Sequence, residues 1–284
     1  MSTVSVEPRY APHSHDMINA FVRHLCDLGR AESTVTTYAD LLCRLDRNLP
    51  EGLAYACADE LREAIHTDDR KPGTRHLYRA AAVAFYRWAC DASDPWLDYN
   101  PTPHLPAVKV NARAPRPVTH EQLRDILNRA RDPYRAWYLL ASAEGLRCVE
   151  ISRLDREDIT ERDTWLRGKG GRERIVPTHP AVWAAVADLP RGPVARTPDG
   201  SRRADRRQVR ERANWYAQNR LGHRDITMHR LRHWYGTYVH KAAGGDIRVA
   251  QELLGHASPT TTQVYVATVD DAARAAVHAL PLPV

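Results

Sequence analysis

The chain has 284 residues, of which 43% are hydrophobic and 27% are charged, a composition that indicates a folded globular protein and argues against extensive disorder. Its five cysteines are an odd number without close pairing, which argues against a disulfide framework or a zinc site, and no apolar run approaches the roughly 18 residues of a membrane span. The formal net charge of +6 favours a polyanionic partner, and we expect the chain to act in the cytoplasm.

The first part of the chain, residues 13–103, is predicted to be a wholly helical domain. Apolar residues at helical spacing indicate four short helices, which would pack as a compact bundle. The four stripes lie at residues 17–28, 38–45, 61–65 and 77–88.

The segment after this bundle is predicted to be an interdomain linker. It reads PTPHLPAVKVNARAPRP over residues 101–117, and its five prolines end any helix. We assign residues 104–117 to the linker and residues 118–284 to a second domain.

The second domain is expected to be mainly helical with a small antiparallel sheet. Thr119 and Gln122 form an S/T-x-x-E/Q capping box at the start of a helix over 119–131, and another helix is expected over 133–143. Helices resume after Thr178, which we expect to cap the next one.

The sheet is predicted to be one hairpin, TWLRGKGGRERIVP, over residues 164–177. Its glycine-rich turn carries Lys169, one of only four lysines in a chain whose positive charge otherwise comes from arginine. Unlike arginine, lysine is able to give up its proton, so Lys169 is a candidate acid. The alternative is a solvated turn lysine.

The segment EGLRCVEI, residues 144–151, holds the first arginine candidate. Gly145 allows a tight turn, Arg147 then opens a short helix, and Glu150 lies one turn later, where it would orient the Arg147 guanidinium. A surface ion pair is the alternative interpretation.

The segment MHRLRHWYGT, residues 228–237, places His229, Arg232 and His233 on one face of a helix. A metal site is disfavoured because Arg230 stands where a general base would follow the first histidine. A purely structural helix explains the apolar residues but not the pair of His229 and Arg232 one turn apart. Phosphate binding explains it, because arginine offers a planar fork to two oxygens and histidine donates a hydrogen bond.

The segment ELLGHASPTTTQVYV, residues 252–266, presents His256 just after a helix end and Tyr265 nine residues later. For a single tyrosine in such a helix, half-buried packing is the ordinary alternative to a chemical role.

Taken in order, these residues resemble the signature of the tyrosine recombinase, or phage integrase, family, which is an ordered Arg, Lys, His-x-x-Arg, His and Tyr. The resemblance covers residues 118–270, and TRHLYRAAAVAFYRWA (74–89) with NPT (100–102) is similar to the family's helical core-binding domain. The motifs that carry it are ASAEGLRCVEISRL (141–154), RGKGGRERIVP (167–177), MHRLRHWYGT (228–237) and DIRVAQELLGHASPTTTQVYV (246–266).

The resemblance implies a two-domain DNA clamp in which Arg147 and Arg232 hold the scissile phosphate, with His229 and His256 completing the cradle. It further implies that Tyr265 attacks phosphorus and leaves a 3′-phosphotyrosine. Neither a metal nor another cofactor nor ATP is expected.

The same resemblance implies that Lys169 protonates the departing 5′ oxygen. Glu150 would orient the Arg147 guanidinium without itself contacting the phosphate. The tail over 270–284 is predicted to be a short helix that packs against a neighbouring subunit in a DNA-bound homotetramer. Docking of that helix on its own domain is the alternative.

Contacts with the DNA backbone are expected mainly from the second part of the chain. Residues 1–103 hold 11 Lys and Arg against 15 Asp and Glu, whereas residues 104–284 hold 30 against 20. The arginine-rich run from Arg202 to Arg212 could line the phosphate backbone, and a solvated helix face is the alternative for part of it. The negative balance of the first domain argues against contacts there. The candidate DNA-binding residues are Thr34, Thr37, Arg75, Arg79, Arg203, Arg207 and Arg210.

The function implied is site-specific DNA recombination at double-stranded attachment or recombination sites, by an integrase of a phage or mobile element acting on the nucleoid. Accessory DNA-bending or directionality proteins are possible partners of such an enzyme. The alternatives are an Xer-like resolvase of chromosome or plasmid dimers, a type IB topoisomerase, and a DNA-binding regulator without catalysis.

Overall fold

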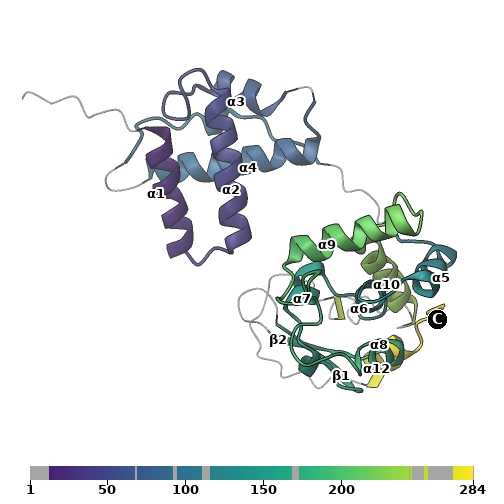
Figure 1. The fold of residues 1–284 in the computed structure, drawn as a ribbon. Coiled ribbons are helices and arrows are strands. Elements are labelled where there is room, and N and C mark those ends of the chain that lie inside the picture. The colour runs from purple at the N-terminus through teal and green to yellow at the C-terminus, as the bar shows by residue number, and fades with distance from the viewer. Residues whose placement is uncertain are drawn as a thin grey trace, which may run out of the picture. The chain divides into compact units, whose positions relative to one another are not determined.

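The computed structural model describes residues 13–67, 69–91, 95–110, 116–167, 173–242, 244, 253–254 and 271–283. The chain divides into two compact units, Met1–Arg113 and Ala114–Val284 (Figure 1). The predicted fold class is confirmed, because the described elements are helices apart from one two-stranded antiparallel sheet. None of the helices within these ranges is long and apolar enough to cross a membrane.

The first unit contains the four predicted helices, with a 3₁₀ turn, η1, at Thr102–His104. Met17, Phe21, Leu42 and Phe85 are fully or almost fully buried between them and form the centre of the core. The stripes found in the sequence are therefore the faces that the helices turn toward one another. The helices are α1 (Ser14–Asp27), α2 (Glu32–Asn48), α3 (Ala58–Ile65) and α4 (Pro72–Cys90).

The second unit is built around helix α6 (Tyr134–Ala143), in which every residue from Ala136 to Ala143 is buried. A helix that is apolar on all sides belongs in the interior of a domain. The other helices of the unit pack around the same core. They are α5 (His120–Arg129), α7 (Cys148–Arg153), α8 (Pro180–Val186), α9 (Arg206–Trp215), α10 (Met228–Ala242) and α12 (Asp271–His278), with shorter turns η2 (Arg156–Asp158) and η4 (Tyr216–Arg220).

Helix α10 packs against α6 through its apolar side. Leu231, Trp234 and Tyr235 are completely buried there. The interleaving of apolar and cationic residues in this segment thus anchors one side of the helix in the core and leaves His229 at the surface.

The start of α5 confirms the predicted capping box. The backbone N–H of Gln122 donates to Oγ1 of Thr119 at 3.1 Å, and the backbone N–H of Thr119 donates to Oε1 of Gln122 at 2.9 Å. Both groups would otherwise lack an intrahelical partner.

The predicted hairpin is also present, with β1 (Asp163–Arg167) paired antiparallel to β2 (Glu173–Pro177). Leu166 and Arg174 are partners in the register, and Leu166 is buried. Arg174 is therefore on the core side of the hairpin, because residues opposite each other in a ladder share a face. The turn that carries Lys169 lies outside the described residues.

The prediction that Thr178 caps the helix after the hairpin is wrong. Oγ1 of Thr178 is instead bonded to Oγ1 of Thr164 across the sheet at 2.9 Å. His179 is the capping residue, because its Nδ1 accepts from the backbone N–H of Ala181 at 3.1 Å at the start of α8.

The C-terminal helix α12 packs against its own unit in the single chain, whereas the sequence favours packing on a neighbouring subunit. Val277 is completely buried in the core of the unit, together with Ala276 and Leu280. Arg274 donates from Nη1 to the carbonyl oxygen of Arg162 and from Nη2 to Oδ1 of Asp163, both at 2.7 Å.

Stability is expected to fall in mild acid because of His179. Burial, together with the nearby His278, lowers the pKa of His179 from 6.5 to about 4. Between pH 6.5 and 4 the imidazole of His179 is protonated in the unfolded chain but neutral in the folded chain. The contribution of His179 to stability is therefore fully present above pH 6.5 and is lost as pH falls toward 4. This proton is worth up to about 3 kcal/mol.

Replacing His179 by Asn keeps a capping side chain and removes the titration. Urea unfolding between pH 4 and 7 should show a flatter pH dependence for His179→Asn than for the wild type. The exposed His76 on α4 provides the control, because His76→Asn should leave the wild-type slope in place. Equal slopes for His179→Asn and the wild type would contradict the assignment.

Candidate active site

The site begins at the tight turn between α6 and α7. Gly145 has a φ of +67°, and a Cβ atom placed there would overlap the ring of Tyr235, so only glycine fits. Arg147 follows as the N-cap of α7, and its backbone N–H donates to Oε2 of Glu150 at 2.6 Å. The short helix thereby fixes both the arginine and the carboxylate one turn away from it.

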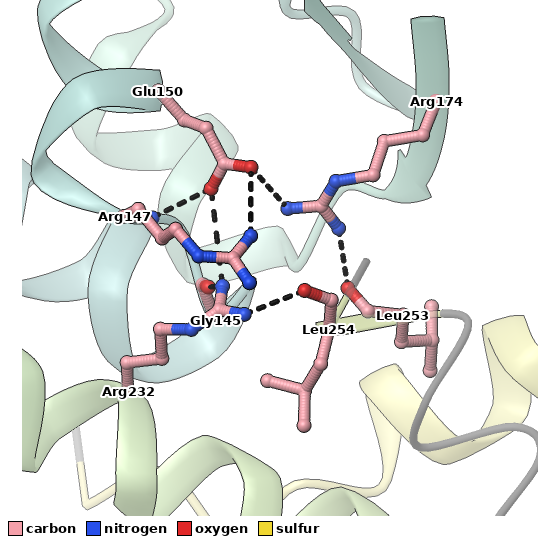
Figure 2. Close-up of polar contacts among 7 residues, drawn as sticks. All are labelled: Gly145, Arg147, Glu150, Arg174, Arg232, Leu253 and Leu254. Carbon is pink, nitrogen blue, oxygen red and sulfur yellow. Dashed lines mark hydrogen bonds and ion pairs between the residues drawn. The ribbon is translucent and has the colours of Figure 1, made fainter. Parts of the chain in front are cut away.

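Glu150 is the centre of a cluster of three guanidinium groups (Figure 2). Its Oε1 lies 2.9 Å from Nη2 of Arg174 and 3.4 Å from Nη1 of Arg147, and its Oε2 lies 3.8 Å from Nη1 of Arg232. The Glu150 side chain is only 7% exposed. Burial by itself raises the pKa of Glu150, but Arg174, the backbone of Arg147 and Arg232 outweigh burial and lower it, so the carboxylate is ionised.

Arg232 is the most deeply buried of these arginines, with 5% of its side chain exposed. It projects from α10 and donates to the carbonyl oxygens of Gly145 and Leu254 (Figure 2). Burial first, and then the charge of Arg147, lower the pKa of Arg232 to about 10, against the opposing effect of Glu150. Arg232 is still a cation at neutral pH.

Arg174 is a member of the cluster that the sequence analysis missed. Its Nη2 donates to Glu150, and its Nη1 donates to the carbonyl oxygen of Leu253 (Figure 2). It therefore joins the hairpin that carries Lys169 to the residues just before His256. The available signal was the two-residue period of the strand, which places Arg174 on the same face as the buried Val176, where a charge needs a partner.

His229 completes the described part of the site. Its ring and that of His233, one turn later on α10, meet edge to face with centroids 4.2 Å apart. Partial burial, and then the charges of Arg232 and Arg147, lower the pKa of His229 below 6.5. The His229 imidazole is therefore neutral at pH 7 and able to accept a proton.

A second glutamate on the same turn is in the opposite protonation state. Glu144 is completely buried, and neither of its carboxyl oxygens has a hydrogen-bond partner among the described residues. Burial raises its pKa to about 8, against smaller opposing effects of Thr164, of the His179 backbone and of the charge of Arg174. It is a neutral acid at pH 7, whereas Glu150 is an anion. The difference follows from the number of guanidinium groups that each one contacts.

The structure brings together Arg147, Glu150, His229 and Arg232 from the predicted set. Lys169, His256 and Tyr265 fall in stretches 168–172 and 255–270, which lie outside the described residues. Leu253 and Leu254, which immediately precede the second stretch, are bonded to Arg174 and Arg232.

The predicted DNA-binding residues of the first unit are Thr34 and Thr37 on α2 and Arg75 and Arg79 on α4. Three of them bond to backbone oxygens within the unit: Thr37 Oγ1 to Ser33, Arg75 Nη2 to Thr67 and Arg79 Nη2 to Leu105. The assignment of these four residues to DNA binding stays a prediction.

In the second unit Arg203 donates to Asp155 at 2.6 Å and to the carbonyl oxygen of Ser152. Arg207 and Arg210 are exposed on α9 and share Glu211. Arg203 thus has a structural partner, while the other two present their charge at the surface.

Comparison with known proteins decides the family. Residues 116–271, more than half of the chain, match the model described as the phage integrase family. The chain belongs to the phage integrase family. It is a site-specific recombinase of the tyrosine type, as the ordered motifs predict.

Relatives of this phage integrase family member match over nearly their whole length. A tyrosine recombinase XerC of Neisseria meningitidis serogroup C is 34% identical over 277 residues, which cover 87% of this chain and 89% of that protein. Among solved structures, the integrase from mycobacterium phage Brujita is 26% identical, with a TM-score of 0.52 and coverage of 93% and 92%. A lambda integrase dimer bound to a COC′ core site shares the fold, with a TM-score of 0.69, 18% identity and coverage of 88% and 99%.

Removal of the central carboxylate is expected to disrupt the site. Glu150→Gln leaves the buried Arg232 and the mostly buried Arg174 without a counter-ion, and breaking a buried pair costs about 3–5 kcal/mol. The free energy of unfolding should fall by that amount in a denaturant titration. Asp59→Asn, which breaks the exposed pair with Arg62, should change it by less than about 1 kcal/mol. A wild-type value for Glu150→Gln would show that Glu150 does not neutralise the cluster.

Proposed function

We propose that this recombinase cuts DNA at a phosphate held by Arg147 and Arg232 and keeps the cut end as a 3′-phosphotyrosine on Tyr265. The observation that supports the proposal is the pair of guanidinium groups from α7 and α10 on one buried carboxylate. The Arg147 side chain is 41% exposed, so its guanidinium is accessible to an incoming phosphate.

Fixed cations suit this chemistry because negative charge builds up on the phosphate oxygens in the transition state. Groups that are already oriented stabilise that charge without reorganising during the reaction. Arg232 is held by two carbonyl oxygens and by Glu150, so its guanidinium plane is fixed before DNA arrives. The arginines would take the part that metal ions take in other strand-transfer enzymes.

Proton transfer would be divided between two residues. Tyrosine has an ordinary pKa near 10, so attack at neutral pH requires removal of the phenol proton, and the neutral His229 is suited to accept it. Lys169 would protonate the departing 5′ oxygen, a contribution of roughly 10²- to 10⁴-fold in rate. His256 would donate a hydrogen bond to the phosphate.

Tyr265→Phe is expected to abolish the covalent link to DNA while leaving DNA binding intact. The phenylalanine ring keeps the size of the side chain and loses the phenol oxygen that would attack phosphorus. Nicked duplexes selected from a random-sequence pool by the wild-type chain serve as substrate, and the covalent complex is measured by denaturing gel with and without EDTA. Tyr99→Phe, at an exposed position of the first unit, is the matched control. Cleavage by Tyr265→Phe, or its loss in EDTA, would refute the proposed chemistry.

For the biological role we propose an Xer-like resolvase rather than a phage or mobile-element integrase. Support comes from the XerC relatives and from a tyrosine recombinase XerD of Mycobacterium tuberculosis. This XerD is 30% identical over 291 residues, which cover 91% of that protein. The integrase remains the second candidate, because the Brujita integrase is 26% identical over a similar span.

The two roles predict different products. A resolvase should separate two directly repeated copies of its selected site from one plasmid into two circles, because both sites are equivalent. An integrase should instead join two non-identical sites on separate molecules. Gel analysis of both substrates incubated with the same protein distinguishes them, and a preference for non-identical sites would overturn the Xer-like assignment.

We further propose that DNA-bound copies assemble into a tetramer, acting in the cytoplasm where the DNA lies. Helix α12, which packs on its own unit in the single chain, would pass to the neighbouring subunit in that assembly. Support for a tetramer comes from the solved structure of a lambda integrase tetramer bound to a Holliday junction, which has a TM-score of 0.69 with this chain.

A further inference from the structure

Arg230 lies on α10 between the two site residues His229 and Arg232, and its contacts point away from the site. Its Nε donates to the carbonyl oxygen of Arg116 at 2.8 Å, and its Nη2 donates to that of Pro117 at 3.1 Å. A single side chain therefore binds two successive carbonyl groups of the segment that leads in from the first unit.

The third nitrogen of Arg230 holds the loop that precedes α10. Nη1 donates to the carbonyl oxygen of Asp225 at 3.0 Å and also contacts the Asp225 carboxylate. The hydrogen bond and charge of Arg230 keep the pKa of Asp225 below its ordinary value, against the effect of burial, so the carboxylate stays charged. The guanidinium is thus surrounded by oxygen atoms from two separate segments.

Only arginine has the shape for this arrangement. Its planar fork directs three nitrogens at different oxygen atoms at once, whereas the ammonium group of lysine is a single point of attachment. The Arg230 side chain is 21% exposed, so most of it is withdrawn from water and from DNA. Its position in a cationic motif therefore does not make it a phosphate contact.

The anchored segment is the entry of the connection into the second unit. The two units divide between Arg113 and Ala114, and Arg116 and Pro117 are the third and fourth residues after that division. On the other side, the first turn of α10 is held by Asn214, whose Oδ1 accepts from the backbone N–H of Met228 at 2.9 Å. A displacement of Arg116 and Pro117 would therefore be transmitted to α10 through the side chain of Arg230.

We propose that Arg230 is a positioning residue that couples the connection between the units to helix α10, so that DNA held by the first unit adjusts His229 and Arg232. This inference rests on the proposed function. A displacement of 1 Å at a reacting group costs on the order of 100-fold in rate, so a small movement of α10 is sufficient for control.

The test compares Arg230→Lys, an insertion of Gly-Ser-Gly between Arg113 and Ala114, and the double variant, all in the full chain. Arg129→Lys is the matched control, because Arg129 also bridges a carboxylate and a carbonyl, Asp125 and Leu221, away from the connection. The rate of covalent complex formation on the selected nicked duplex and its dissociation constant are measured together. Hydrogen exchange of the amides at 226–234 is followed with and without the intact duplex.

The expected result is a loss of about 10- to 100-fold in rate for Arg230→Lys and for the insertion, with DNA affinity unchanged and with a fall in melting temperature for Arg230→Lys no larger than that of Arg129→Lys. The double variant should be no slower than either single variant, because both interrupt the same coupling. DNA binding should increase the protection of the 226–234 amides in the wild type and in Arg129→Lys, and not in the other variants.

If the losses of rate in the two single variants add in the double variant, the role of Arg230 is purely local and the inference is overturned. It is also overturned if DNA binding increases the protection of the 226–234 amides equally in all variants. If Arg230→Lys proves unfolded, an insertion that cleaves at the wild-type rate overturns it on its own. Absence of a covalent complex with the wild-type chain refutes the proposed function instead, and the exchange measurement still decides whether the coupling exists.

Discussion

The candidate site depends on one buried carboxylate. Glu150 faces three guanidinium groups at 2.9, 3.4 and 3.8 Å, and without it these like charges would repel one another in a region of low exposure. With it, the cations of α7, β2 and α10 are assembled before any DNA is bound. Such preorganisation is what electrostatic catalysis requires, because the protein does not reorient its dipoles during the reaction. On the same turn Glu144, which is completely buried, has its pKa raised by burial to about 8, whereas the guanidinium groups around Glu150 lower the pKa of that carboxyl.

The arginines also connect parts of the chain that are far apart in sequence. Arg174 joins β2 to the carbonyl of Leu253, Arg232 joins α10 to those of Gly145 and Leu254, and Arg230 joins α10 to the start of the unit. Guanidinium groups that bind backbone carbonyls fix main-chain position as well as charge. This accounts for part of the arginine excess without assigning every arginine to DNA.

Local patterns were sufficient to predict much of the fold and part of the site. The box of Thr119 and Gln122 and the hairpin are short-range features, and the spacing of Arg147 and Glu150 fits one helical turn, so the sequence alone indicates them. What it did not indicate depends on tertiary contacts. The partners of Arg174, the ion pair of Arg203 with Asp155, and the bond from Thr178 to Thr164 that leaves His179 as the cap all join segments separated in sequence.

The two fixed ends around the proposed nucleophile have a further consequence. Sixteen residues separate Leu254 from Asp271, and the structure anchors the chain on both sides of them, through the carbonyl held by Arg232 and through Arg274 of α12. Because Arg274 and the buried Val277 hold α12 to its own unit, the chain after the proposed nucleophile is fixed to the same unit as the two arginines. Transfer of α12 to a neighbouring subunit, as proposed for the assembly on DNA, would exchange these contacts for contacts on the neighbour, so the end of one chain would be fixed to the unit of another.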